Sequence, residues 1–328
     1  MTIRVTVWNE NVHESTEPEI LSIYPEGIHG AIGAAVSALL GDDVEIRLAT
    51  LQQPSHGLGE EVLESTDVLI WWSHIAQEDV TDDVVSRVYE RVMRGMGFIA
   101  LHSATKSKIL RRLLGTSCCV RWRHGHDREL VWTIKPDHPI AQGLPEVFAV
   151  EQQEMFGEFF DIPDPDELVF LSTFSGGEVL RSGLCYRRGF GRVFYFSPGD
   201  QSYPVYHNPH IQRVIANAVQ WAAPERAFVT SPTSAATARR AGSRKSSRGT
   251  RREDGPVHQA LRRSFVGGGC RYRRRARIRR HRPAHPRGLP RDAGGRRVDR
   301  VLPTAVRAVA DPRPDRHDRH DRRRSLPR

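Results

Sequence analysis

Short apolar segments alternate with amphipathic segments along residues 3–114. The segment 67–72, Asp-Val-Leu-Ile-Trp-Trp, is apolar nearly throughout, which is typical of a strand covered on both faces. Helical spacing follows it, since Val84, Val88 and Val92 recur on one side before Gly95 ends the segment. The alternation predicts a parallel sheet with right-handed crossovers, with strands at 3–8, 44–48, 67–72 and 98–102 and helices at 29–40, 82–94 and 106–114.

The pattern changes after Gly115 to extended segments separated by proline and glycine clusters. A last helix is predicted to start at Asn208 and Pro209, because apolar residues from Ile211 onward recur at helical spacing. Residues 1–225 are therefore expected to form one α/β domain. We expect antiparallel strands at the edge of its parallel sheet, at 129–134, 167–173, 178–186 and 191–197.

Charge divides the chain near residue 225. Residues 1–225 carry 18 Lys and Arg against 31 Asp and Glu, whereas residues 226–328 carry 31 against 8. The two regions thus have net charges of −13 and +23, and the positive net charge of +10 for the whole chain comes from the C-terminal segment. The domain itself is acidic, which argues against a nucleic-acid partner for it.

Two interpretations of residues 226–328 stay open. The segment has no sustained period of 2 or 3.6 residues, so it is predicted not to bury a core. Of its 31 basic residues 30 are arginine and only Lys245 is lysine, whereas basic arms that bind nucleic acid usually mix the two. The segment is either an out-of-frame extension or a disordered, low-complexity basic arm, and a nucleic-acid partner of such an arm would bind with strong salt dependence.

The cysteines and the N-terminus bear on the cellular compartment. Cys118, Cys119, Cys185 and Cys270 show no CxxC spacing, so we expect reduced thiols. The chain begins with a strand pattern rather than a signal peptide, and it lacks an apolar stretch of about 18 residues. These features predict a cytoplasmic protein without a membrane partner, and they leave a homo-oligomer open.

Polar residues gather at the ends of three predicted strands. The first strand ends at Asn9 with His13 soon after it, the third is followed by His74 and the fourth ends at His102. A single histidine is more often structural than functional. Because ligands of parallel sheets bind beyond the carboxyl ends of the strands, we expect these side chains to converge on one site.

Two further candidates lie where helices are predicted to start. Ser103 stands at a strand-to-helix junction of the nucleophile-elbow type, but the flanking glycines of that motif are absent. Ser103 is therefore either an attacking hydroxyl, a helix cap or a ligand-binding hydroxyl. Tyr24 and His29 lie in Tyr-Pro-Glu-Gly-Ile-His-Gly, whose glycines suit a loop close to a ligand. A helix dipole would keep His29 neutral, as a metal ligand, a base or a packing residue.

The second half of the domain supplies an acidic candidate. Glu154 and Glu158 lie in a run with Glu151, and such a run is usually a solvated face. Flanking phenylalanines indicate that part of it points inward, so Glu154 or Glu158 is a candidate general acid or base.

A polar loop follows residue 197. It contains Asp200, Tyr203 and His207, which together offer the hydrogen bonds and ring faces that suit a sugar. Trp122 is a further candidate for stacking on a sugar ring, together with Trp8 and Trp72, although a tryptophan at a strand end is more often packed in a core.

A series of short motifs occurs in order along residues 3–223. Among them are Val7-Trp8-Asn9-Glu10, Tyr24-Pro25-Glu26-Gly27-Ile28-His29-Gly30, Leu101-His102-Ser103, Glu154-Met155, Phe160-Asp161-Ile162-Pro163 and Tyr206-His207-Asn208. Together they resemble the trehalose-utilisation ThuA family. The resemblance implies a flavodoxin-like three-layer sandwich, with a mainly parallel sheet and an antiparallel extension, related to class I glutamine amidotransferases. It also implies bacterial carbohydrate metabolism, with trehalose or a related disaccharide, or a 3-keto form, as the substrate class.

Three departures qualify what the resemblance implies. The amidotransferase cysteine position falls at the turn of His102 and Ser103, so glutamine hydrolysis by a thiolate is excluded. Family members carry histidines where this chain has Thr105 and Asp200. If those histidines bind a divalent metal such as zinc, this chain keeps at most His29, His74, His102 and Asp200, and its zinc affinity is expected to be weak or absent.

Two hypotheses for the domain follow from these residues. The first is an enzyme of sugar catabolism in which Glu154 transfers a proton, His102 and Asp200 orient or polarise the substrate, and other polar side chains hold its hydroxyls. The second is a non-catalytic sugar-binding or sensor protein that kept the pocket and lost the histidines. The candidate sugar-binding residues are Asn9, His13, Tyr24, His29, His74, Trp122, Tyr203 and His207.

Overall fold

The computed structural model describes residues 2–224, and the arginine-rich segment 226–328, whose two interpretations are given above, lies outside the described residues. The strands are β1 (Ile3–Asn9), β2 (Val44–Thr50), β3 (Val68–Trp72), β4 (Gly97–Leu101), β5 (Arg121–Thr133), β6 (Val147–Gly157), β7 (Glu167–Phe174), β8 (Val179–Arg188) and β9 (Gly191–Phe196). The α-helices are α1 (His13–Thr16), α2 (Pro18–Ile23), α3 (Gly27–Leu40), α4 (Glu60–Glu64), α5 (Asp82–Met93), α6 (Lys108–Leu114) and α7 (Pro209–Ala222).

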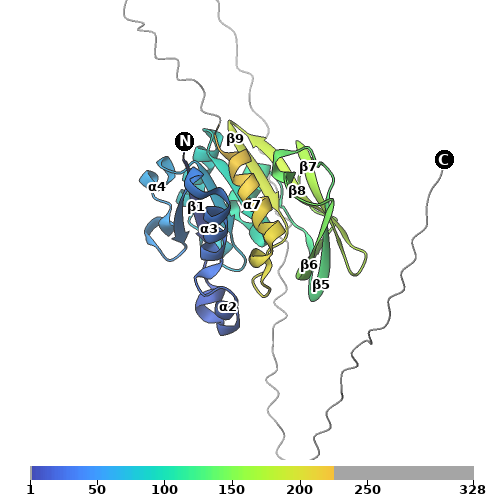
Figure 1. Ribbon diagram of the computed structural model, residues 1–328. Coiled ribbons are helices and arrows are strands. Elements are labelled where there is room, and N and C mark those ends of the chain that lie inside the picture. Colours follow the sequence, from blue (N-terminus) through green and yellow to red (C-terminus); the bar gives the residue numbers. More distant parts are fainter. Residues whose placement is uncertain (1, 225–328) are drawn as a thin grey trace, which may run out of the picture. The chain divides into compact units, whose positions relative to one another are not determined.

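The strands form one mixed sheet in the order β2-β1-β3-β4-β9-β8-β7-β5-β6. The strands from β2 to β9 in this order run parallel, and those from β9 to β6 run antiparallel. β9 joins the two halves, because it pairs parallel with β4 and antiparallel with β8. The antiparallel strands extend beyond the helices on one side (Figure 1).

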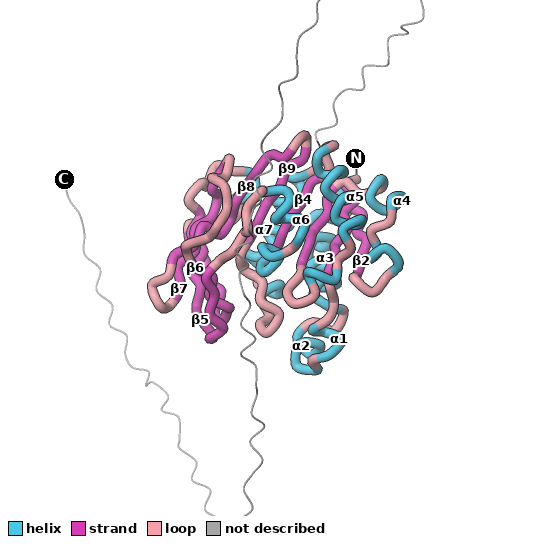
Figure 2. Tube along the Cα trace, turned by 180° about the vertical axis from the view of Figure 1, so that it is seen from behind, coloured by secondary structure: helices cyan, strands magenta, loops and turns pink. Residues whose placement is uncertain are grey.

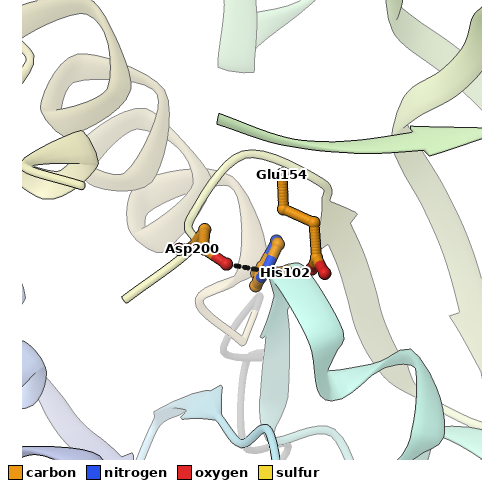
Figure 3. Close-up of side chains that lie close together, drawn as sticks. All are labelled: His102, Glu154 and Asp200. Carbon is orange, nitrogen blue, oxygen red and sulfur yellow. Dashed lines mark ion pairs between the residues drawn. The ribbon is translucent and has the colours of Figure 1, made fainter. Parts of the chain in front are cut away.

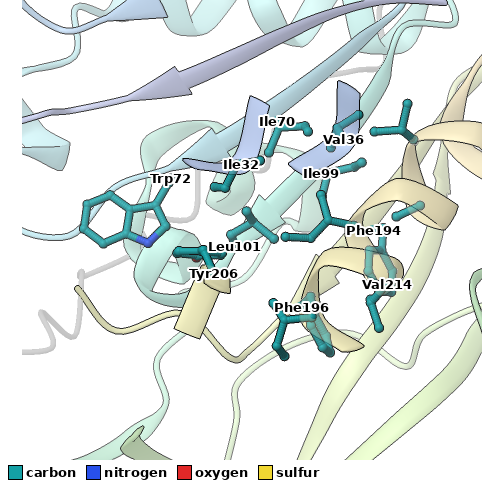
Figure 4. Packing of buried hydrophobic residues seen from close by; sticks show 14 of the residues in the cluster. Ile32, Val36, Ile70, Trp72, Ile99, Leu101, Phe194, Phe196, Tyr206 and Val214 are labelled. Atoms are coloured by element: carbon teal, nitrogen blue, oxygen red, sulfur yellow. The ribbon is translucent and has the colours of Figure 1, made fainter. Parts of the chain in front are cut away.

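Alternation along the central strands builds a core on each face of the sheet. In β3, Ile70 and Trp72 face the core under α3 and α7, whereas Leu69 and Trp71 face the core under α5 and α6. Figure 4 shows side chains of the first core, and Figure 2 shows the molecule from the side of α5 and α6. Strands with two buried faces are apolar nearly throughout, which explains the uninterrupted apolar segments of the sequence.

Local signals set the ends of the helices. Ser107 caps α6 by accepting a hydrogen bond from the backbone N–H of Leu110, and Asn208 caps α7 in the same way. Gly97 lets α7 approach β4, since a Cβ there would stand 2.4 Å from the backbone oxygen of Ala222. The helices are thereby fixed close against the sheet.

The predicted fold class is confirmed, with several differences in detail. The segment 191–197, predicted to be an antiparallel edge strand, is the central strand β9 and lies parallel to β4. The acidic run around Glu154 is part of β6, which was not predicted as a strand. The helix expected from Lys106 begins at Lys108, after a 3-10 turn over His102–Lys106. Within residues 2–224, the helices are all too short or too polar to cross a membrane.

Candidate active site

His102 occupies a strained position at the carboxyl end of β4. Its φ angle is +51°, in the left-handed region that non-glycine residues seldom adopt. The side chain is fully buried, and its Nδ1 lies 2.9 Å from the backbone oxygen of Ser197. Strain of this kind costs roughly 1–3 kcal/mol and is concentrated at functional sites.

Glu154 reaches the same edge of the sheet from β6. The pairing of β5 with β6 shifts register between Arg123 and Asp127 and again before Glu129. Such bulges bend a strand and redirect its side chains. They separate the part of β6 that contains Glu154 from the regular ladder with β5, and Glu154 is buried with only 5% of its surface exposed.

Asp200 follows β9 on a loop that two hydrogen bonds hold. Trp72 Nε1 donates to the backbone oxygen of Gly199, at 3.0 Å, and the backbone N–H of Ser202 donates to Asp200 Oδ1, at 2.7 Å. A Cβ at Gly199 would lie 2.0 Å from the hydroxyl of Tyr206, so glycine is required at this turn. The second carboxylate oxygen of Asp200 stays free to face His102.

The three side chains form one buried cluster (Figure 3). His102 Nε2 lies 3.3 Å from Glu154 Oε2 and 3.8 Å from Asp200 Oδ2. Burial lowers the pKa of His102, but the carboxylates of Glu154 and Asp200 outweigh burial, so the pKa lies above its usual value. Among the described residues, His102 Nε2 and Asp200 Oδ2 make no hydrogen bond of good geometry. The cluster therefore sets a buried imidazole, whose protonated form is favoured, against two carboxyl groups, and two of its polar atoms can still form hydrogen bonds.

Phe156 fixes the plane of the His102 ring. The two rings are stacked, with centroids 4.7 Å apart and an angle of 4° between their planes. Because Phe156 lies two residues beyond Glu154 on β6, one strand holds both the ring and its carboxylate partner.

Gln153 ties the two carboxylate-bearing segments together. Its side-chain oxygen accepts hydrogen bonds from the backbone N–H groups of Glu154, at 3.0 Å, and Asp200, at 3.1 Å. Its amide nitrogen donates to Glu129 Oε2, at 3.4 Å. Burial raises the pKa of Glu129 to about 7, with Ser172 and Gln153 offsetting part of the effect. The fully buried carboxyl group of Glu129 thus holds Gln153, and Gln153 holds the backbone of Glu154 and of Asp200.

A second group of polar residues adjoins the cluster. The ring of His74 lies 6.2 Å from that of His102 between centroids, and its Nδ1 is 2.8 Å from Nε2 of His13. The other ring nitrogen of His13 lies 2.6 Å from a carboxylate oxygen of Glu17. Burial, together with His102 and His13, holds the pKa of His74 well below its usual value.

Asn9 and His29 lie together, away from the cluster. Asn9 Nδ2 is 2.7 Å from Glu14 Oε1 and 3.2 Å from Nδ1 of His29. Burial lowers the pKa of His29, in agreement with the neutral ring expected from the sequence. Glu14 also accepts a hydrogen bond from the backbone of Ile28, so the group anchors the start of α3.

Tyr24, Tyr203 and His207 are linked to one another. The hydroxyl of Tyr24 donates to the backbone oxygen of Tyr203, at 2.6 Å, and His207 stacks on Tyr24. Tyr24 is buried, so its hydroxyl is already engaged within the protein. Tyr203 is the member that lies nearest the cluster, because its ring stacks on that of His124, whose Nδ1 lies 3.8 Å from Asp200 Oδ2. The hydroxyl of Tyr203 lies 3.1 Å from Nδ1 of His126.

Ser103, Trp8 and Trp72 have structural roles in this structure, whereas Trp122 is exposed. The hydroxyl of Ser103 donates to the backbone oxygen of Ser73, at 2.9 Å, and it does not cap α6. Trp8 is fully buried and stacks on Trp71, and Trp72 is buried under the Asp200 loop. Trp122 is 46% exposed, with the ammonium group of Lys106 over its ring.

Sequence reasoning missed His124, His126 and Gln153. His124 Nδ1 lies 3.8 Å from Asp200 Oδ2, and its side chain is half exposed. His124 and His126 stand two residues apart, a spacing that in a regular strand puts both on one face, and they lie in the part of β5 where the pairing with β6 shifts register. That spacing was the available signal, but residues 121–128 were not predicted to be a strand.

The model of the ThuA family, described as trehalose utilisation, matches residues 4–222. The chain belongs to the ThuA family. A search of curated proteins found no match.

Several solved structures are similar to this chain. A protein of Parabacteroides merdae described as ThuA-like has a TM-score of 0.50 and 13% identity, over 68% of this chain and 90% of that one. A ThuA-like protein of Bacteroides uniformis has a TM-score of 0.47 and 15% identity, over 67% and 90%. A glutamine amidotransferase of Thermotoga maritima has a TM-score of 0.39 and 14% identity, over 61% and 76%.

In this ThuA-family chain the two departures at Thr105 and Asp200 have different surroundings. Thr105 is fully buried and its hydroxyl donates to the backbone oxygen of Ser103, at 3.4 Å. Asp200 belongs to the cluster, where one donor atom each from His102, Glu154 and Asp200 lie within 4.8 Å of one another. His29 and His74, expected as ligands, are not part of this group of atoms, and Glu154 is.

Proposed function

We propose that the protein acts on a carbohydrate, trehalose or a related disaccharide or its 3-keto form, by proton transfer at His102, Glu154 and Asp200. The family description of trehalose utilisation supports the substrate class. The observation that carries the chemistry is the contact of 3.3 Å between a buried imidazole with a raised pKa and a buried carboxylate. In such a pair the surroundings favour a proton on one group and not on the other, so His102 can act as the acid and Glu154 as the base.

The spacing of the carboxylates favours one class of reaction. Glycosidases hold two carboxyl groups about 5–5.5 Å or about 6.5–9.5 Å apart on either side of the bond they cleave. Here the oxygens of Glu154 and Asp200 lie within 4.8 Å of each other and share the imidazole of His102. Both carboxylates face the imidazole of His102, in the place where a glycosidase holds the bond that it cleaves. Proton abstraction beside a carbonyl group fits better, and it leads to elimination or isomerisation.

A 3-keto disaccharide supplies the carbonyl group for this reaction. Glu154 removes a proton from the carbon next to the ketone, and the electron pair of the C–H bond moves toward the carbonyl oxygen. The imidazolium of His102 donates a hydrogen bond to that oxygen and stabilises its negative charge. Asp200 keeps the imidazole charged. Glu154 is the member that meets the substrate first, because it alone of the three retains exposed surface.

A non-catalytic sugar-binding or sensor protein is the alternative from another class. Thr105 and Asp200, which stand where the family resemblance implies histidines, favour it. The full-length protein should be screened against trehalose, sucrose, maltose and their 3-keto forms for binding and for turnover. Turnover of one of them is the expected result, whereas tight binding without turnover would favour the sensor.

A divalent ion such as zinc is a second candidate for the same cluster. The three donor atoms within 4.8 Å, two of them without a good hydrogen bond among the described residues, favour it. A bound ion would polarise a carbonyl oxygen in place of the imidazolium. We propose that affinity is weak, because the ion must displace the proton that both carboxylates stabilise on His102. Metal analysis of the protein purified without chelator tests this, and one equivalent of zinc would overturn it.

We also propose a cytoplasmic location in bacterial carbohydrate catabolism. The free thiols of Cys118, Cys119 and Cys185 support a reducing compartment. Cys270 lies outside the described residues.

A further inference from the structure

Glu17, His13 and His74 form a chain of contacts that runs from the surface to the edge of the cluster. Glu17 is half exposed, His13 is buried and His74 contacts the ring of His102. The two links measure 2.6 Å, from Glu17 to His13, and 2.8 Å, from His13 to His74. The acid–base chemistry proposed above does not use any of the three residues.

The direction of the hydrogen bonds follows from the chemistry of the carboxylate. An ionised Glu17 can only accept, so Nδ1 of His13 donates to it. A neutral His13 then has its lone pair on Nε2, which accepts a hydrogen bond from Nδ1 of His74. With a neutral His13, His74 carries its proton on Nδ1.

The backbone around His74 is held independently of this chain. The buried carboxylate of Glu10 accepts hydrogen bonds from the backbone N–H groups of Ile75, at 2.7 Å, and Ala76, at 3.0 Å. The amide of Gln77 donates to the backbone oxygens of His74 and Ser103, both at 2.9 Å. The loop after β3 thus holds His74 beside the turn after β4.

We infer that Glu17 and His13 are positioning residues that fix His74 in one tautomer, with the lone pair of Nε2 presented to a hydroxyl group of a bound sugar. Within residues 2–224, Nε2 of His74 has no hydrogen-bond partner, and the side chain is half-buried. A hydroxyl group that donates its proton completes the chain. The inference rests on the proposed function for the identity of the ligand, and it assigns His74 to binding and orienting the sugar.

The tautomer can be measured without any ligand by ¹⁵N NMR of the histidine side chains, because protonated and unprotonated ring nitrogens resonate in separate ranges. We expect His74 and His13 to show a proton on Nδ1 and none on Nε2. Glu17→Ala should shift both rings to a mixture of tautomers. Glu17→Gln, which keeps an acceptor oxygen, should restore the native pattern. Glu19→Ala, on an exposed residue of α2, is the matched control and should change nothing.

Two outcomes would overturn the inference. One is a proton on Nε2 of His74 in the unmodified protein, and the other is an unchanged tautomer in Glu17→Ala. If a sugar is turned over, Glu17→Ala should lower turnover or binding by about 10- to 100-fold, with rescue by Glu17→Gln. Absence of turnover of any sugar would count against the proposed function but would leave the tautomer result standing.

Discussion

His102 Nε2 and Glu154 Oε2 lie 3.3 Å apart although their residues come from opposite halves of the sheet. His102 directly follows β4 of the parallel half, and Glu154 belongs to β6 of the antiparallel half. Both side chains are buried, so a charge on either one is removed from water, and His102 faces the carboxyl groups of Glu154 and Asp200. Removing one partner of such a pair leaves the remaining charge without its counterpart.

Glu154→Gln tests the proton transfer assigned to the carboxylate. The amide keeps the shape of the side chain but cannot take a proton, so turnover of the active sugar should fall by about 10²- to 10⁴-fold. Binding of the same sugar should change little. Turnover and binding are measured by steady-state kinetics and by calorimetry. Glu151→Gln, three residues earlier on β6 and exposed, is the control. Equal losses in turnover and binding would contradict the assignment.

Trp72→Phe tests the support of the Asp200 loop. The change removes the hydrogen bond of 3.0 Å to the oxygen of Gly199 and leaves that buried oxygen without a partner. The free energy of unfolding should fall by about 1–3 kcal/mol. Trp132→Phe is the control, since its indole donates at the same distance of 3.0 Å to Thr173 on the exposed side of the sheet. Both variants are compared by chemical denaturation. Equal losses in the free energy of unfolding would show that burial of the hydrogen bond to Gly199 does not make it more important than the exposed one.

Gly199→Ala tests the packing of the turn against Tyr206. The new Cβ would stand 2.0 Å from the hydroxyl of Tyr206 and 3.0 Å from Cβ of His102. The clash should cost about 1–3 kcal/mol in addition to backbone strain. Gly41→Ala isolates the backbone strain, because Gly41 also has a positive φ but no atom near its Cβ position. Thermal unfolding compares the two variants, and equal midpoints would contradict the clash.

Glu129→Gln tests the buried carboxyl group behind Gln153. Burial raises the pKa of Glu129 from 4.5 to about 7, so between these values the folded protein binds more protons than the unfolded chain. The free energy of unfolding should therefore fall as the pH rises from 4.5 through 7, by up to about 3 kcal/mol. Glu129→Gln should lose this dependence and be the more stable protein at pH 8.

Denaturation of the two proteins at several pH values measures the effect. Glu146→Gln, at an exposed position before β6, is the control and should follow the unmodified protein. A parallel pH profile for Glu129→Gln and the unmodified protein would show that Glu129 is ionised in the fold.

The sequence predicts the parallel half of the fold better than the antiparallel half. Strands such as β3 are buried on both faces, and their apolar runs and flanking helices identify them without any partner. β6 alternates less clearly, because its bulged pairing with β5 brings Glu154 and Gln153 inward together. The parallel pairing of β9 with β4 depends on a long-range contact that periodicity does not encode.

The candidate site was likewise easier to predict from the parallel half than from the antiparallel half. Convergence of His74 and His102 followed from their places after neighbouring parallel strands, and the structure brings their rings to 6.2 Å. The carboxyl group of Glu154 and its aromatic neighbours make it a candidate acid or base in the sequence, and in the structure it lies 3.3 Å from His102. The involvement of Gln153 and His124 follows from the bulges of β5 and β6, which depend on the pairing of two strands. Their roles in catalysis or binding stay predictions.

The measurement that tests the account most directly is exchange of hydrogen for deuterium at the carbon next to the ketone of a 3-keto disaccharide, followed by ¹H NMR in D₂O with the full-length protein. We expect 3-ketotrehalose or a related 3-keto disaccharide to exchange in the presence of the unmodified protein and of Glu151→Gln. Exchange should fall to the uncatalysed rate with Glu154→Gln and with His102→Gln. Exchange that persists unchanged in both of these variants would contradict proton transfer at the cluster, as would its absence with the unmodified protein for every sugar that binds.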